Sequence, residues 1–305
     1  MMGLGRRQAR EERLSVRCDR AGARGFTLLE VLLGVLLTAI LLAGIYNVFS
    51  SQEKGQIVVD QVAEMNQDLR VATQRITRDM RMAGYHLENA TATSGLGPVN
   101  GVTITPGAGN NPDGLTMLYV DASFNTSITA PMPAPSSILN VSNVCPGPGT
   151  PEACPGSTNC FCDNDIILIT DGANSSVFCI TQVVAASLNI QHNPGGGPCD
   201  AYNDPGGHGL FPGYGTGSRL YRLKILQYRI DPDPGDGHPR LSLSENGGNF
   251  NPLVDYIQDM QVTPTTPNER VYTVSLTART RKPLTGLGGT RHRTTTQQVR
   301  MRNIN

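Results

Sequence analysis

Apolar residues fill the chain almost without interruption from Phe26 to Tyr46, and Glu30 is the only charged residue in that stretch. About 20 predominantly apolar residues are enough to cross the hydrocarbon core of a bilayer as a helix. The pattern therefore predicts a membrane-spanning helix over residues 26–46. A carboxylate inside such a segment costs about 2.5–3.5 kcal/mol on insertion scales, so Glu30 needs an explanation.

Beyond this run, apolar residues recur at spacings of three and four, which is typical of one face of a helix. They are Val58, Val62, Met65, Leu69, Ala72, Ile76, Met80 and Ala83. The other faces carry charged residues: Asp60, Glu64, Asp68, Arg70, Arg75, Arg78, Asp79 and Arg81. No proline interrupts residues 26–84, and Gly84 is a natural helix end. We therefore predict one long helix over 26–84, transmembrane over 26–46 and amphipathic over 50–84, with possible bends at Gly34, Gly44 and Gly55.

After residue 85 the pattern changes to short β-like runs between turn-rich stretches. Predicted strands cover residues 114–121, 165–172, 176–184, 219–230, 256–264 and 271–279, with a hairpin turn over 171–175. Gly/Pro-rich loops are predicted over 95–113, 130–158, 193–217 and 282–290. The expected fold class is α+β: a long N-terminal helix whose second part packs on an antiparallel β-sheet domain formed by residues 85–305.

Charge is distributed unevenly along a chain whose formal net charge is zero. Residues 1–25 hold seven arginines and three acidic residues, a net charge of +4, so the remaining residues carry −4. A basic segment before an apolar one favours a cytoplasmic N-terminus and a C-terminal part across the membrane. The acidic balance of the remaining chain gives no support to a nucleic-acid partner.

Three kinds of N-terminal segment could contain this apolar run. A secretory signal peptide has a shorter apolar region, of about 7–15 residues. A lipoprotein signal is suggested by residues 42–44, but Ile45 stands where the lipidated cysteine belongs. The third is a prepilin leader: Arg24-Gly25-Phe26-Thr27-Leu28-Leu29-Glu30 resembles the GFTLxE signature of the type IV pilin and pseudopilin superfamily.

The resemblance implies that prepilin peptidase cleaves between Gly25 and Phe26 on the cytoplasmic side and that Phe26 is then N-methylated. Residues 1–25 would be a removed leader. The resemblance also implies that Glu30 meets the terminal amine of a neighbouring subunit during assembly, and that other pilins contact the N-terminal helix. Pairing with its own amine, or a carboxyl that reaches the membrane interface, are the alternatives for Glu30. The implied location is the inner membrane, as a single-pass protein with a periplasmic C-terminal domain, and then the pilus.

Further short stretches resemble PilW-type minor pilins. They are "MRMAGY" (80–85), the Asp-Gly-Leu-Thr stretch 113–116, the strand 165–171 and "VRMRN" (299–303). The implied function is that of a minor pilin in type IV pilus assembly, as a priming, tip or accessory subunit. A pseudopilin of a type II secretion system and a membrane- or pilus-anchored adhesin module are the alternatives.

Seven cysteines divide between leader and mature chain. Cys18 lies in the leader, and six remain: Cys145, Cys154, Cys160, Cys162, Cys179 and Cys199. An even number outside the cytoplasm favours disulfides, in any of 15 pairings. A zinc site is disfavoured because one residue separates Cys160 from Cys162 and no histidine lies within 145–179. We expect the disulfides to staple loops that are too rich in Gly and Pro to form much core.

The remaining polar motifs give little support to a metal site or to catalysis. Asp231, Asp233 and Asp236 form a weak calcium candidate, but two prolines intervene, no loop-closing Glu follows, and a solvated turn is favoured. The chain has neither a Gly-x-Ser-x-Gly elbow nor a His-Glu-x-x-His motif, and its five histidines are scattered. We expect neither a cofactor nor enzymatic activity.

Overall fold

The structure is a computed structural model, and it describes residues 25–87, 90–92, 99–109, 111–132, 138–145, 160–193, 199, 202–203, 213–266, 269–283 and 289–301. Internal contacts divide the chain into two units, residues 1–56 and 57–305. The first described unit is the N-terminal part of one helix. The second contains the rest of that helix and all the strands described below.

Helix α1 (Leu28–Met82) confirms the predicted long helix to within two residues at each end. Its helical backbone continues through all three glycines at which a bend was considered. The helix ends before Gly84, which adopts a left-handed φ of +79° and donates its N–H to the carbonyl of Leu118 at 2.8 Å. Glycine adopts this conformation without steric cost, which makes it a frequent residue after a helix end.

The strands are β1 (Ala90–Ala92), β2 (Val102–Thr105), β3 (Gly114–Ser127), β4 (Ile138–Asn140), β5 (Ile166–Thr170), β6 (Ser175–Cys179), β7 (Gln182–Val184), β8 (Asn189–Gln191), β9 (Arg219–Pro232), β10 (Pro239–Glu245), β11 (Asn251–Asp255), β12 (Ile257–Thr266), β13 (Glu269–Arg279) and β14 (His292–Arg300). A short 3-10 helix, Ala185–Ser187, separates β7 from β8. All six predicted strands are present. The predicted strand over 176–184 is interrupted and forms β6 and β7.

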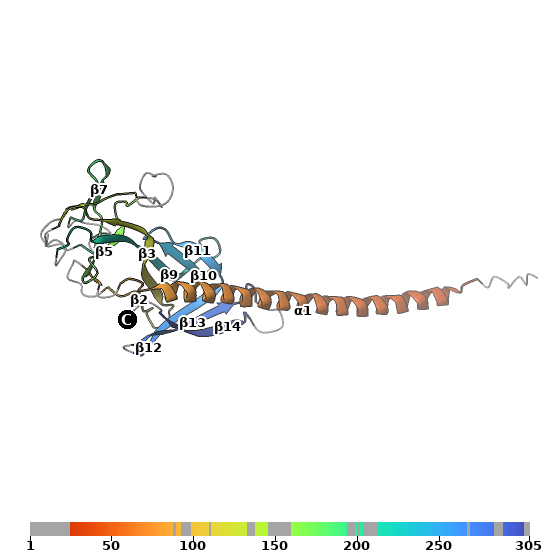
Figure 1. The fold of residues 1–305 in the computed structure, drawn as a ribbon. Coiled ribbons are helices and arrows are strands. Elements are labelled where there is room, and N and C mark those ends of the chain that lie inside the picture. Colours follow the sequence, from red (N-terminus) through yellow and green to blue (C-terminus); the bar gives the residue numbers. More distant parts are fainter. Residues whose placement is uncertain are drawn as a thin grey trace, which may run out of the picture. The chain divides into compact units, whose positions relative to one another are not determined.

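Within the described residues the strands form three sheets (Figure 1). The largest has the order β1-β6-β5-β9-β10-β11. Strand β3 lies outside this order and pairs with both β9 and β2. The others are β12-β13-β14 and β4-β8-β7. Every described pair is antiparallel, as predicted, except the parallel pair β1–β6. The single sheet expected from the sequence is thus replaced by three.

The amphipathic part of α1 packs on strands of two sheets. In Figure 1 this part of the helix lies between β9–β10 and β12–β14. Six members of the predicted apolar stripe, from Met65 to Ala83, are at most 5 % exposed, whereas Val62 and Val58 are only partly buried. The six buried members share one core cluster with residues such as Met117, Leu226 and Leu276. Burial of a side chain of this size stabilises the fold by about 1.5–3 kcal/mol, so this stripe is a main source of stability.

A second core cluster corrects the expectation that the Gly/Pro-rich regions form little core. Leu139, Val141 and Val144, from the predicted loop 130–158, are at most 5 % exposed and pack with Phe124 and Phe161. Strand β4 lies within this region and pairs with β8. The short apolar stretch 138–144 carries enough buried surface to organise a region whose composition resembles that of a loop.

Disulfides hold this part of the structure, as predicted. Cys145 is bonded to Cys160, and Cys179 to Cys199. Cys162 is also disulfide-bonded, while Cys154 lies outside the described residues. In the chain-entropy model, a bridge that closes a loop of about 15 residues stabilises the fold by about 3 kcal/mol. The Cys145–Cys160 bridge spans such a loop.

One charged residue that the sequence pattern places on an outer face of α1 is buried instead. Asp79 is 6 % exposed, accepts a hydrogen bond from the hydroxyl of Tyr228 on β9 and pairs with Arg75 at 2.9 Å. Desolvation, together with the hydrogen bond to Asp79, raises the pKa of Tyr228, so its hydroxyl stays protonated and donates. The assignment of Asp79 to the helix faces away from the apolar stripe is therefore wrong, and β9 supplies the partner that makes its burial tolerable.

We predict that Tyr228→Phe lowers the stability of the full chain by about 1–3 kcal/mol, because it leaves the buried Asp79 carboxylate without its neutral donor. The measurement is thermal unfolding in detergent. Tyr272→Phe is the matched control, since Tyr272 is only partly buried and its hydroxyl makes no hydrogen bond within the described residues. Equal midpoints for the two variants would contradict the prediction.

Candidate functional site at the start of the helix

Thr27 and Glu30 form a reciprocal pair of hydrogen bonds at the N-terminus of α1. The Thr27 hydroxyl oxygen accepts the backbone N–H of Glu30 at 3.3 Å, and Glu30 Oε2 accepts the N–H of Thr27 at 3.2 Å. This is a capping box: the side chain of each residue accepts the backbone N–H of the other, so two N–H groups without a helical partner are satisfied. A carboxylate in the first turn is also favoured by the helix dipole.

Glu30 therefore has a local structural role that was not considered in the interpretation of the sequence. The signal was present, because Thr27-Leu28-Leu29-Glu30 has the Thr-x-x-Glu spacing of a capping box. Thr27 is thus the site residue that sequence reasoning missed. The box uses Oε2 alone, and Oε1 makes no hydrogen bond within the described residues. One carboxylate oxygen of Glu30 remains available to a cation from outside the chain.

The predicted cleavage site precedes the helix. Gly25, Phe26 and Thr27 are not helical, and the first helical hydrogen bond runs from the N–H of Val31 to the carbonyl of Thr27. The Phe26 side chain is 84 % exposed. A protease needs an accessible, non-helical backbone, and the peptide bond between Gly25 and Phe26 meets both conditions. The structure does not describe residues 1–24 of the expected leader.

All large apolar side chains from Phe26 to Phe49 are exposed, on every face of the helix. This is the one helix in the described residues long and apolar enough to cross a membrane. Inside the apolar stretch, the hydroxyl of Thr38 donates to the carbonyl of Gly34 at 2.7 Å, which satisfies its polar group within the helix. A helix that is apolar all round is stable when lipid or other helices surround it.

The comparison with known families bears on this segment. Residues 20–46 match the family described as the prokaryotic N-terminal methylation motif. The chain carries a prepilin-type methylation motif. The match supports a type IV pilin-like protein that prepilin peptidase processes and that the inner membrane anchors, and proteins with this motif are generally structural. It ends at Tyr46, before any strand begins. No curated protein matches the chain.

The acidic turn between β9 and β10 holds the weak calcium candidates. Asp233, Asp236 and His238 each place one possible ligand atom within 4.8 Å of the others. However, Asp233 pairs with Arg240 at 2.7 Å, and Asp231 lies 3.7 Å from the same guanidinium. A calcium ion would have to compete with this arginine. The geometry therefore favours the interpretation as a charged turn.

His238 is the last residue of that turn, directly before β10. It contacts the carboxylate of Asp236, lies 3.3 Å from that of Asp255 and stacks on Tyr256 with ring centroids 4.5 Å apart. Desolvation alone would lower the pKa of His238, but the hydrogen bonds and charges of the two carboxylates outweigh it and raise the pKa. The imidazole of His238 thus links the β9–β10 turn to the end of β11, and the two carboxylates favour its protonated form.

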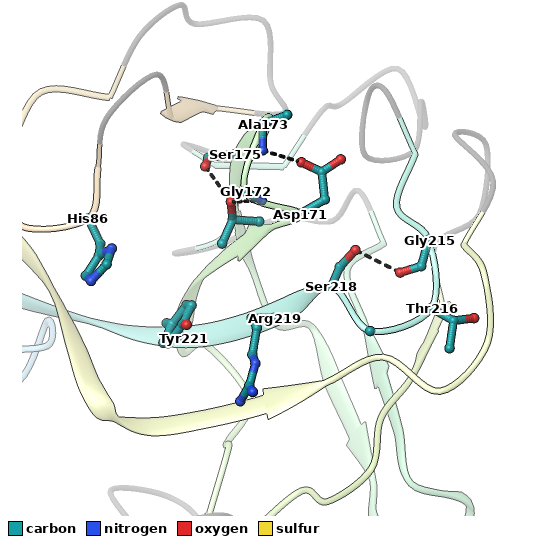
Figure 2. A pocket seen from close by; sticks show the side chains of 12 residues that line it. His86, Asp171, Gly172, Ala173, Ser175, Gly215, Thr216, Ser218, Arg219 and Tyr221 are labelled. Carbon is teal, nitrogen blue, oxygen red and sulfur yellow. Dashed lines mark hydrogen bonds between the residues drawn. The ribbon is translucent and has the colours of Figure 1, made fainter.

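A cavity of about 740 Å³ lies among His86, the β5–β6 turn and the start of β9 (Figure 2). Its polar groups are largely bonded to one another. Asp171 accepts the N–H groups of Ala173 and Asn174 at 2.8 and 2.7 Å, and the Ser218 hydroxyl donates to the carbonyl of Gly215 at 2.7 Å. These bonds build a rigid polar wall and contain no nucleophile–base pair.

We predict that Gly25→Leu leaves the arginine-rich leader attached, because a branched side chain would occupy the space next to the bond to be cleaved. Intact-mass analysis of membrane protein should then show the 25-residue leader on the variant and its absence from the wild type. Gly55→Leu, in α1 and beyond the matched residues 20–46, should be processed normally. A mature-length Gly25→Leu protein would contradict the assignment of the cleavage site.

Proposed function

We propose that this chain is a minor pilin that takes part in type IV pilus assembly as a priming, tip or accessory subunit. It enters the inner membrane with its N-terminus in the cytoplasm and its β-rich part in the periplasm, and then joins the pilus. The observation that carries the proposal is the helix start, where a capped Glu30 with one unused oxygen stands on a helix that is apolar on all sides.

Glu30 has two functions in this proposal. Through Oε2 it closes the first helical turn, and through Oε1 it receives the methylated amine of a neighbouring subunit's Phe26. The exposed apolar faces of α1 would be surrounded by other pilin helices after assembly, where water is scarce. In such surroundings an unpaired amine or carboxylate is strongly destabilising, so the pair fixes the position of each incoming subunit.

Two other functions use the same anchor. A pseudopilin of a type II secretion system would share the leader, the processing and the helix. An adhesin module on a pilus-like anchor is supported by the polar cavity beside His86, which is large enough for a small ligand. Loss of filaments on deletion supports the pilus subunit, loss of secretion supports the pseudopilin, and loss of surface binding with intact filaments supports the adhesin.

The deciding experiment is mass spectrometry of sheared, purified pili. We expect this chain to be present and to begin with N-methylated Phe26. The membrane fraction of the same cells is the control for contamination. Processed protein that is confined to membranes, with none in the filaments, would count against the pilus subunit.

We predict that Glu30→Gln enters the membrane normally but is depleted about tenfold or more from filaments, because the amide keeps the capping box and loses the charge. Thr27→Ala keeps the charge and weakens the cap, which costs about 0.5–2 kcal/mol of helix stability. It should therefore reach filaments at nearly the wild-type level. The measurement is the amount in sheared pili relative to the amount in membranes.

Glu30→Ala, which loses both functions, should be at least as depleted as Glu30→Gln, and Glu30→Asp should lie between Glu30→Gln and the wild type. If Glu30→Gln matched the wild type while Thr27→Ala failed, the capping box alone would explain the carboxylate. The pairing with a neighbour's amine would then be wrong.

A further inference from the structure

Helix α1 and the last strand, β14, enclose a groove of about 410 Å³. Arg293, Thr295 and Gln297 line its strand side, and as alternate residues they point to one face of the sheet. Arg70 and Thr73 line its helix side. Next to this polar section the helix packs on strands through the apolar stripe, with Leu69, Ala72 and Ile76 in the core cluster.

Two guanidinium groups border the groove without a carboxylate partner. Arg293 is oriented by Asn66, whose side-chain oxygen accepts its N–H at 2.6 Å. In the part of the chain that the structure describes, neither Arg293 nor Arg70 forms an ion pair. Both are exposed to solvent at the mouth of the groove. Arginines held in this way suit a carboxylate, which can accept two parallel hydrogen bonds.

Thr73 provides an independent observation. Its side chain is 8 % exposed, yet its buried hydroxyl has no hydrogen-bond partner within the described residues. Thr77, one turn later on the same side of α1, donates its hydroxyl to Gln297 at 3.2 Å. Buried hydroxyls are normally hydrogen-bonded, so the hydroxyl of Thr73 lacks a polar partner in the groove.

We propose that the α1–β14 groove is a docking site for an acidic segment of a neighbouring pilin-type subunit. A carboxylate of that segment pairs with Arg70 and Arg293 and accepts the hydroxyl of Thr73. A protein segment fits better than a small anion, because β14 pairs only with β13 in the described residues and leaves an open strand edge beside the groove. This proposal rests on the proposed function.

The test uses the full chain in its native membrane, with a photoreactive amino acid in place of Gln74, which lines the groove. Crosslinks should map to an Asp- or Glu-containing segment of another subunit with a prepilin-type leader. Arg70→Glu with Arg293→Glu should lower the crosslink yield about tenfold. The matched control is Arg81→Glu with Arg300→Glu, which reverses two exposed arginines on the same two elements outside the groove and should change the yield less than twofold.

Thr73→Val separates docking from packing. The substitution removes a buried unpartnered hydroxyl, so it should leave the thermal midpoint unchanged or higher while it lowers the crosslink yield about threefold. A further expected result is that reversing the charge of the crosslinked acidic residue restores the yield of the Arg70→Glu, Arg293→Glu variant.

The proposal would be overturned by equal yields for the two arginine pairs, by a wild-type yield for Thr73→Val, or by a crosslinked segment without an acidic residue. A higher yield for the groove variant would also overturn it, and would show that the arginines protect the edge strand from association. The crosslink is formed in membranes and needs no filament. If the chain is absent from sheared pili but the acidic crosslink persists, the proposed function fails while the groove assignment stands.

Discussion

Helix α1 must be stable in two different surroundings, and the rest of the structure depends on how its sequence meets that requirement. From Phe26 to Phe49 every large apolar side chain is exposed, so this part is suited to lipid or to other helices. From Val58 onward only one stripe is apolar, and strands of two sheets cover it. The same backbone geometry serves both, because a helix satisfies its own backbone hydrogen bonds in either environment.

Polar contacts within the second unit fix how that cover is assembled. Asp113, before β3, accepts the N–H of Val262 on β12 at 2.9 Å, and its own N–H donates to the carbonyl of Met260 at 2.8 Å. Asp79 joins α1 to Tyr228 on β9. These buried carboxylates link elements that apolar packing alone would leave free to slide, since hydrogen bonds are directional and apolar contacts are not.

Patterns of strict period were enough to predict the helix, its apolar stripe and six strands. Some of the missed strands lack such a pattern, whereas β10 was missed although Leu241 and Leu243 alternate with polar residues. In β14, threonines and glutamines replace apolar residues: Thr294 pairs with Thr277 at 2.8 Å on one side, and Gln297 meets Thr77 on the other. The stretch "VTIT" of β2 lies in a Gly-rich region whose composition predicted a loop. Asp79 was assigned to the other faces because of its charge, although it follows Ile76 by three residues and precedes Ala83 by four, as a member of the stripe would. The partner that allows its burial is a tyrosine 149 residues away.

The candidate site is also only partly predictable from the sequence. The leader motif predicted Gly25 and Phe26 as the cleavage site and Glu30 as the assembly residue, and the spacing of Thr27 and Glu30 indicated the capping box as well. The α1–β14 groove could not be predicted, because it arises where residues more than 200 positions apart in the sequence meet, as the 227-residue separation of Asn66 and Arg293 illustrates.

The distance in sequence between β14 and the helix stripe has a consequence for biosynthesis. Val299 and Met301 belong to the same core cluster as Met65 and Leu69, so the helix stripe is not fully covered until β14, more than 200 residues later in the sequence, has been made. Contacts between such distant parts of a chain form slowly, because a long loop must close first. During that interval the stripe is exposed. A chaperone that binds amphipathic helices near the membrane surface would therefore act on this chain before its fold is complete.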